Sequence, residues 1–257
     1  LPFFYCIGNC SRCEQFSFNK KLLFENVIKQ LFKYLINTLL DRKCKVCGAT
    51  LEHDEFGICH ECEKGDLFFH PKLHIRGNIL EERLYGLTKF ETAEALMPYS
   101  DVAQTLVHDL KYYNSRNIAQ LFGRKISEHI ITNNLYSHID YIIPVPLHTN
   151  RIKQRGYNQS ELVANKIAEC LGSIVNSTNL YRAYDNPSQT HKSFTERQQN
   201  VKGIFALHDS TMFSNKTVLL VDDVFTTGST IIDCCRALNQ SPNIKIHIFT
   251  ATVAHIY

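Results

Sequence analysis

The sequence has no long apolar run and no strong excess of charge of either sign. No stretch approaches 18 uncharged apolar residues, so no membrane span is expected. The amino end, Leu1 to Phe4, lacks the basic-then-apolar order of a signal peptide, which makes a cytoplasmic location the expectation. A formal net charge of +3 is too small to diagnose nucleic-acid binding. The Walker A pattern G-x-x-x-x-G-K-[ST] is absent, which argues against a P-loop nucleotide site.

The composition is that of an ordinary folded protein. Apolar residues make up 44% of the 257 residues and charged residues 21%, as in typical globular domains. This length suits one sizeable α/β domain, with a large core, and one small additional module.

The most informative stretch runs from Val218 to Thr230. Its first four residues are apolar and predict a strand that is buried on both faces. The strand ends at two adjacent carboxylates, Asp222 and Asp223, and a hydroxyl-rich turn then leads into a helical pattern over Ile231 to Leu238. The stretch therefore predicts a strand, an acidic tip, a turn and a helix.

The turn is suited to binding a phosphate. The start of a helix exposes unpaired backbone N–H groups, and Gly228 lets the backbone close around an anion. Asp222 and Asp223 would face whatever the phosphate carries, and two acceptor-only side chains suit vicinal sugar hydroxyls and a magnesium ion. A 5-phosphorylated ribose satisfies both features, the alternative being acids that merely cap the next helix. The predicted phosphate ligands are Thr226, Thr227, Gly228, Ser229 and Thr230.

A second predicted anion site follows the apolar strand Tyr141 to Pro146. Three cations within five residues, Arg151, Lys153 and Arg155, are expected on a loop that Gly156 closes. The two arginines could bind diphosphate oxygens bidentately, whereas the lysine offers a point charge. The alternatives are a nucleic-acid patch and a plain basic loop.

The remaining pattern predicts the elements around these two sites. A helix is expected over Glu161 to Leu171, capped by Asn158 or Ser160. Further expected elements are a strand at Tyr85 to Phe90 and helices over Tyr99 to Tyr113 and Ile118 to Ile131.

A long polar segment, 185–201, follows the strand expected at Leu180 to Arg182. A segment of this kind is expected to close over a reactive site. Arg182, Lys192 and Arg197 could then reach diphosphate oxygens, the alternative being that they are solvated charges.

Seven of the ten cysteines lie before residue 63. In a cytosolic protein such cysteines favour metal binding over disulfides. Two C-x2-C pairs separated by eleven residues predict a structural zinc site, because so short a ribbon needs the roughly 10–16 kcal/mol that zinc contributes in finger peptides. His60 could substitute for a cysteine, but all four nearby histidines, His53, His60, His70 and His74, are expected to be solvated. The predicted ligands are Cys44, Cys47, Cys59 and Cys62.

The amino-terminal region leaves two questions open. Cys6, Cys10 and Cys13 have the spacing of the iron–sulfur motif of radical S-adenosylmethionine enzymes, but Arg12 stands where those enzymes usually carry an aromatic residue. The alternative is a leader with free thiols. The helical pattern over 18–40 predicts an amphipathic helix, which either binds a membrane surface or partner or packs onto the following module.

All thirteen positions of Val218 to Thr230 match the phosphoribosyl pyrophosphate (PRPP) signature of type I phosphoribosyltransferases, and the basic segment resembles their diphosphate loop. The linked motifs, from about Cys44 onward, resemble the ComF family more specifically. They are the four cysteines, Leu110-Lys111, Pro144-Val145-Pro146-Leu147, Arg151, Arg155 to Ser160, Gln189, Glu196-Arg197, Asn200-Val201 and the paired-aspartate signature.

This resemblance implies an α/β fold of the type I phosphoribosyltransferase kind, a parallel sheet flanked by helices, preceded by a small four-cysteine zinc ribbon. The expected organisation is a leader over 1–40, a zinc-ribbon module over 41–66 and a phosphoribosyltransferase-like domain over 67–257. The implied ligands are PRPP, Mg²⁺ bound with it, and structural Zn²⁺. The implied partners are single-stranded DNA and competence helicase or processing proteins.

Two classes of function follow from the resemblance. The first is a pentosyl transferase that acts in DNA uptake and moves phosphoribose, with Asp222 and Asp223 as catalytic residues. The second is a non-catalytic protein that senses PRPP or binds single-stranded DNA with the same fold. Thr226 occupies the position at which hypoxanthine-guanine enzymes carry an acid that meets the purine, so a 6-oxopurine acceptor is disfavoured.

Overall fold

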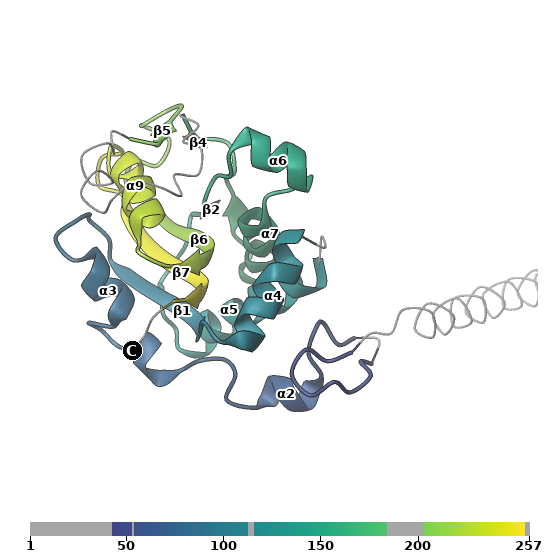
Figure 1. Cartoon of the computed structure of the whole chain (residues 1–257). Coiled ribbons are helices and arrows are strands. Elements are labelled where there is room, and N and C mark those ends of the chain that lie inside the picture. Colours follow the sequence, from purple (N-terminus) through teal and green to yellow (C-terminus); the bar gives the residue numbers. More distant parts are fainter. Residues whose placement is uncertain (1–42, 53, 113–115, 184–202, 255–257) are drawn as a thin grey trace, which may run out of the picture. The chain divides into compact units, whose positions relative to one another are not determined.

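Five parallel strands form the central sheet, in the order β1-β7-β6-β2-β3 (Figure 1). Strand β6 pairs on both sides, with Val218 opposite Tyr141 of β2 and opposite Ile246 of β7. Its apolar run is therefore buried, as predicted. The strands of this sheet are β1 (Thr92–Pro98), β2 (Tyr141–Pro144), β3 (Ile174–Val175), β6 (Thr217–Phe225) and β7 (Lys245–Val253).

The computed structural model describes residues 43–52, 54–112, 116–183 and 203–254. Residues Cys44–Tyr257 group into one compact unit. Several predictions lie outside the described residues: Cys6, Cys10 and Cys13, the helix within 18–40, His53, Lys192 and Arg197.

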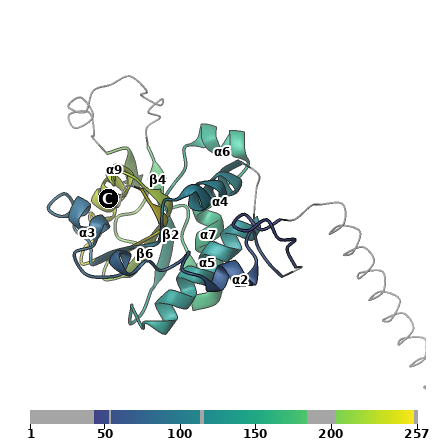
Figure 2. The same ribbon diagram turned by 60° about the horizontal axis from the view of Figure 1, so that its bottom comes forward.

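Helices cover both faces of the sheet (Figures 1 and 2). The side chains of β6 alternate between two hydrophobic clusters: Leu219 and Val221 pack with α4, α5 and α7, whereas Val218 and Leu220 pack with α3 and α9. This alternation follows from the period of two in a strand. The bounds are α3 (Ile79–Leu84), α4 (Asp101–Tyr112), α5 (Arg116–Thr132), α7 (Gln159–Leu171) and α9 (Ser229–Leu238).

The connections of the sheet define where a ligand would bind. Helix α7 joins β2 to β3 on one face, and α9 joins β6 to β7 on the other face. The chain thus leaves the adjacent strands β2 and β6 in opposite directions, which makes their carboxyl ends a topological switch point. Pro144 at the end of β2 lies opposite Val221, one residue before the acid pair.

The helices α4 and α5 confirm two predictions, but the expected strand at Tyr85 to Phe90 is wrong. These residues form a turn and coil after α3, with Gly86 at φ +70°, and β1 begins later, at Thr92. Five consecutive residues of β1, Ala93 to Met97, are buried. A strand buried on both faces shows no alternation of apolar and polar residues, which is why the pattern missed it.

The basic segment also differs from the prediction, because it is a helix rather than a loop. Helix α6 (Thr149–Arg155) begins after His148, whose side chain accepts a hydrogen bond from the backbone N of Asn150. It ends at Gly156, which adopts φ +82°. The residues Ile152 to Arg155 have no strong bias against helix, so the short segment that carries the cations forms a helix.

The segment with the four cysteines packs on α4 and α5. Ile58 is fully buried in the same cluster as Leu106 and Ile118. Gly57 has φ +75°, and a Cβ at that position would collide with Ile118 Cδ1, so this contact requires glycine. The short helices of this region are α2 (His60–Lys64) and η1 (Pro71–Leu73). The predicted boundary between residues 66 and 67 stays a prediction.

A second, two-stranded antiparallel sheet joins β4 (Leu180–Arg182) and β5 (Phe205–Leu207). The backbone N of Ile204, just before β5, donates to Asp233 Oδ2 of α9 at 3.0 Å.

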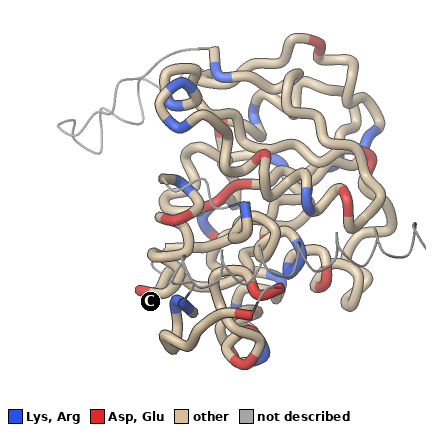
Figure 3. Tube along the Cα trace, turned by 90° about the vertical axis from the view of Figure 1, so that its right-hand side faces the viewer, with Lys and Arg blue, Asp and Glu red and all other residues tan. Residues whose placement is uncertain are grey.

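Basic and acidic residues are interspersed along the chain (Figure 3). Among the described helices, none has the length and apolar character that crossing a bilayer would need.

Candidate functional site

The two predicted acids lie side by side near the carboxyl end of β6. Asp222 and Asp223 are only 8% and 5% exposed. Ser160 Oγ donates to Asp222 Oδ1 at 3.0 Å, and the backbone N of Asp223 donates to the same oxygen at 2.9 Å. Lys111 Nζ lies 3.0 Å from Asp223 Oδ2. The carboxylates are therefore held in position by α7, by their own backbone and by α4.

The burial of the pair changes its protonation. Burial, and then the charge of Asp223, raise the pKa of Asp222 to about 8. Two adjacent buried carboxylates cannot both ionise cheaply, so Asp222 holds a proton at neutral pH. Lys111 Nζ, 3.0 Å from Asp223 Oδ2, is the cation beside the pair.

The predicted phosphate turn follows directly after the acids. Gly228 has φ +79° and is the N-cap residue of α9, to which it offers no side-chain acceptor. A Cβ on Gly228 would lie 2.8 Å from Phe225 Cζ, so the turn packs too closely for a larger residue. Thr227 Oγ1 lies 3.1 Å from Ser229 Oγ. The backbone N of Ser229 donates to Thr227 Oγ1 at the long distance of 3.4 Å. Because Gly228 has no side chain to cap α9, an anion at this exposed turn could accept from the first N–H groups of the helix.

Arg83 supports this turn from α3, a role that the sequence did not reveal. Its Nη1 donates to the backbone O of Thr226 at 2.7 Å and to the backbone O of Ala254 at 2.9 Å. It thereby ties the turn to the chain that follows β7. The two carbonyls are 143 and 171 residues away in sequence, so no local pattern could have shown the contact.

The cations of the basic segment are held less firmly than the acids. Arg151 and Lys153 are exposed on α6, whereas Arg155 is half-buried. Arg155 Nη1 donates to Gln159 Oε1 at 3.0 Å, and its guanidinium lies 5.2 Å from the centre of the Tyr112 ring. The structure thus orders one of the three predicted cations by contacts within the protein.

The two candidate caps of α7 have separate roles. Asn158 Oδ1 accepts from the backbone N of Ser160 at 3.1 Å, and Asn158 Nδ2 donates to the backbone O of Val145 at 3.0 Å. Asn158 therefore caps α7 and ties it to the chain after β2, which leaves the Ser160 hydroxyl free to bind Asp222.

Arg182, predicted to contact a diphosphate, ends β4, and its guanidinium lies 5.9 Å from the centre of the Phe205 ring.

The last turn of α4 joins several parts of the site. Tyr157 Oη donates to the backbone O of Leu110 at 2.6 Å, and Lys45 Nζ lies 3.0 Å from Asp109 Oδ2. Lys111 was not predicted to be a site residue. One signal could have identified it: Lys111 stands four residues after the buried Val107, so a cation occupies the apolar stripe of the helix.

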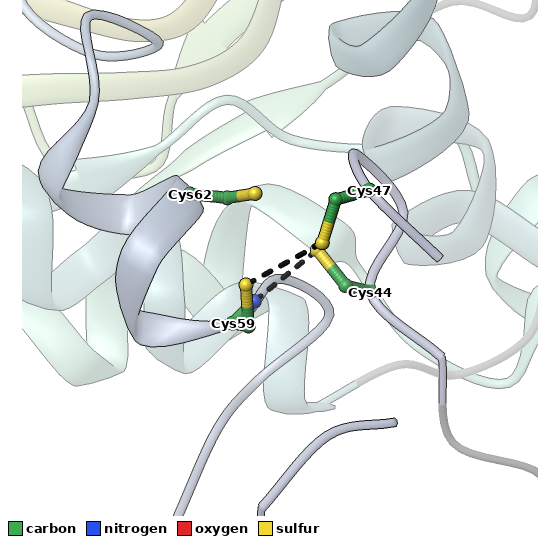
Figure 4. A group of neighbouring side chains, drawn as sticks. All are labelled: Cys44, Cys47, Cys59 and Cys62. Atoms are coloured by element: carbon green, nitrogen blue, oxygen red, sulfur yellow. Dashed lines mark hydrogen bonds between the residues drawn. The ribbon is translucent and has the colours of Figure 1, made fainter. Parts of the chain in front are cut away.

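The four cysteines converge as the spacing predicted (Figure 4). Their sulfur atoms all lie within 4.8 Å of one another. Although burial raises its pKa, backbone N–H groups of Cys47, Cys59 and Val46 lower the pKa of the Cys44 thiol to about 6. A set of four thiols with one already favouring the thiolate fits zinc. His60 Nε2 instead faces Asp54 Oδ2 at 3.2 Å.

A second group of side chains was not predicted. The expectation that His74 is solvated is wrong, because its Nδ1 lies 2.8 Å from the buried Glu94 Oε2 and its side chain is 11% exposed. His129 Nε2 lies 2.9 Å from the same oxygen. These three ligand atoms could hold a metal ion, yet both distances are those of hydrogen bonds. Burial opposes ionisation of Glu94, but the two imidazoles lower its pKa to about 2.

Comparison with known proteins agrees with this geometry. Residues 152–253 match the family described as phosphoribosyl transferase domain. DNA utilization protein YhgH of Salmonella typhimurium is 28% identical over 209 residues, covering 80% of this chain and 88% of its own. Competence protein F of Haemophilus influenzae is 28% identical over 211 residues, covering 77% of this chain and 91% of its own. Competence protein ComFC of Bacillus subtilis is 24% identical over 196 residues, covering 76% of this chain and 70% of its own.

A solved adenine phosphoribosyltransferase is 16% identical and covers 52% of this chain and 79% of its own, with a TM-score of 0.33, which is too low to add to the assignment. The parallel sheet with helices on both faces and the family match define a phosphoribosyltransferase-like α/β fold, with a four-cysteine cluster before it. Within that superfamily, the relatives named DNA utilization protein YhgH, competence protein F and competence protein ComFC support the resemblance to the ComF family.

Proposed function

We propose that this protein binds PRPP at the carboxyl ends of β2 and β6. One observation carries the proposal: a buried acid pair is followed by a glycine turn at the start of α9, at the topological switch point of the sheet. In this assignment the turn from Thr226 to Thr230 binds the 5-phosphate, and the acid pair accepts hydrogen bonds from the ribose hydroxyls. The cations of α6 bind the diphosphate.

Magnesium would accompany PRPP. The acid pair and the oxygens of the diphosphate are hard ligands of the kind that Mg²⁺ prefers. Such an ion would neutralise charge on the diphosphate as it leaves. The contribution of the chain itself is to orient the sugar between the phosphate turn and α6, at Arg151, Lys153 and Arg155.

We further propose that the bound phosphoribose is transferred to an acceptor. The bond from the anomeric carbon to the diphosphate breaks, and the diphosphate leaves with the bonding electrons. An acceptor nucleophile then forms the new bond to that carbon. The carboxylates of Asp222 and Asp223 would stabilise the positive charge that develops on the sugar, the proton held by Asp222 having passed to solvent when the ligand binds. Holding both ends of PRPP supplies the orientation.

The biological role in this proposal is DNA uptake. It rests on the resemblance to the ComF family and on the names of the relatives, which are DNA utilization and competence proteins. The partners would be single-stranded DNA and competence helicase or processing proteins. A non-catalytic protein that senses PRPP or holds DNA phosphates is the second candidate, since the same contacts serve binding without transfer.

The test of PRPP binding is calorimetry with PRPP and Mg²⁺. The double variant Asp222→Asn and Asp223→Asn should lose at least tenfold in affinity, because charge-assisted hydrogen bonds contribute about 1.5–3 kcal/mol each. Asp101→Asn, which neutralises an exposed acid in the first turn of α4, is the control. Unchanged affinity in the double variant would refute the ribose assignment.

A second titration separates the two candidates. Labelled single-stranded DNA is titrated with and without PRPP, and product formation from PRPP is followed in parallel. Competition without turnover would favour the binding protein, whereas release of diphosphate in the presence of an acceptor would favour the transferase.

We also propose that zinc at Cys44, Cys47, Cys59 and Cys62 is structural. All four sulfurs would fill its coordination shell, leaving no open position for catalysis. Metal analysis should find one zinc per chain at this cluster, and chelation should unfold the segment before α3. A fold that is unaffected by chelation would refute the structural role.

A further inference from the structure

We propose that Lys111 is a ligand-contacting residue that makes the site selective for a ribose 5-phosphate bearing an anionic group on C1. The inference rests on the proposed function and names its specificity determinant. Lys111 Nζ lies 3.0 Å from Asp223 Oδ2, with side-chain exposures of 23% and 7%. The lysine belongs to α4 and therefore lies outside residues 152–253, the part that matches the phosphoribosyl transferase family.

The position of Lys111 is between the two halves of the proposed site. The residue before it, Leu110, accepts a hydrogen bond from Tyr157 at 2.6 Å. The residue after it, Tyr112, lies under the guanidinium of Arg155. Thus one side of this helical turn faces the basic segment, while the Lys111 side chain reaches the acid pair. A ligand that spans from Asp223 to Arg155 must pass beside Lys111.

Stability alone does not account for a lysine here. Val107 and Leu110 on the same stripe of α4 are buried apolar residues, and an apolar residue at position 111 would extend that stripe. Replacing a buried ion pair by apolar residues is often neutral or stabilising, so such a pair is weak evidence of a stabilising role. The placement of Lys111 beside two acids at a topological switch point is instead characteristic of a residue that takes part in function.

The donors of Lys111 match the needs of such a ligand. An ammonium group has three donors and no acceptor, and that of Lys111 lies 3.0 Å from Asp223 Oδ2 as an ion pair. Asp223 Oδ2 itself has no hydrogen-bond partner among the described residues, so the donors of the ammonium group can also serve oxygens of a substituent on C1. Lys111 places a cation beside Asp222 and Asp223, so an anionic substituent meets less repulsion there than the two carboxyl groups alone would exert. A sugar phosphate with only a hydroxyl on C1 gains little from the same cation.

The experiment compares the affinities for PRPP and for ribose 5-phosphate, at one Mg²⁺ concentration, in the full chain and in Lys111→Met. Affinity for PRPP should fall about tenfold or more, the loss expected for a charge-assisted hydrogen bond. Affinity for ribose 5-phosphate should change less than about threefold. Lys111→Arg should restore part of the preference for PRPP, because it keeps the charge but changes its shape.

The matched control is Lys125→Met, which removes a lysine of α5 that pairs with Glu63 and Glu128. It should leave both affinities unchanged. Circular dichroism establishes that each variant is folded; if Lys111→Met does not fold, Lys111→Gln takes its place.

Three outcomes would overturn the inference. Equal affinity of Lys111→Met and the wild type for PRPP would show that Lys111 does not contact the ligand. An equal loss of affinity for both ligands would show that Lys111 only maintains the conformation of the acid pair. These results leave the proposed function standing, provided that the wild type binds PRPP. If the wild type binds neither ligand, the proposed function fails and the inference fails with it.

Discussion

The two halves of the proposed site differ in how the fold holds them. The acid pair and the turn at Gly228 follow a strand with neighbours on both sides, and Ser160, Lys111 and Arg83 fix their positions. The basic half is a seven-residue helix on which two of the three cations are exposed. Packing therefore sets the geometry of the first half. The second half supplies cations whose side chains would become ordered when a ligand binds.

The largest effect is expected from Gly228→Ala in the packed half. The substitution forces φ +79° on a residue with a Cβ and brings that Cβ to 2.8 Å from Phe225 Cζ. We expect a loss of about 2 kcal/mol in the free energy of unfolding. We also expect a fall in PRPP affinity of about 100-fold, because several phosphate donors move together. Denaturant unfolding and calorimetry measure the two effects, with Gly172→Ala, at φ +66° after α7, as the control for backbone strain alone.

A smaller effect, on binding alone, is expected in the basic half. Arg151→Gln should reduce PRPP affinity about tenfold and change stability by less than about 0.5 kcal/mol, since an exposed residue carries little packing. Lys153→Gln should have the weaker effect of the two, because lysine cannot bind a diphosphate bidentately. A large loss of stability in Arg151→Gln would contradict the contrast between the halves.

Tyr157→Phe tests how the basic half is attached. It removes the hydrogen bond to the Leu110 carbonyl at 2.6 Å, which should cost about 1 kcal/mol of stability. PRPP affinity should fall only a few-fold, since the cations remain. An unchanged melting temperature would show that α6 does not depend on this link to α4.

A separate effect, on stability without any ligand, is expected in its pH dependence. The pKa of Asp222 is raised to about 8 by burial and by Asp223, whereas an unfolded aspartate has a pKa of about 3.9. The folded state holds the proton more tightly, so this contribution to stability is fully present below about pH 4 and is lost as the pH rises towards 8. Urea unfolding from pH 4 to 8 should therefore show a flatter profile in Asp222→Asn. Parallel profiles would contradict the assignment of the proton.

The sequence predicted the packed half better than the basic half. The run Val218 to Val221 could only be a buried strand, and the turn to α9 is encoded by adjacent residues. The Thr149–Arg155 segment was expected to be a loop because its charges suggested a ligand site, although its residues tolerate helix. Lys111 and Arg83 act on residues more than 100 positions away, so their roles depend on how the helices pack on the sheet.

A crystal structure of the wild type with PRPP and Mg²⁺ tests the central claim most directly. The account predicts the 5-phosphate within hydrogen-bond distance of the first N–H groups of α9, the ribose hydroxyls against Asp222 and Asp223, and the diphosphate beside Arg151 and Arg155. PRPP bound at another place, with the turn at Gly228 empty, would contradict it.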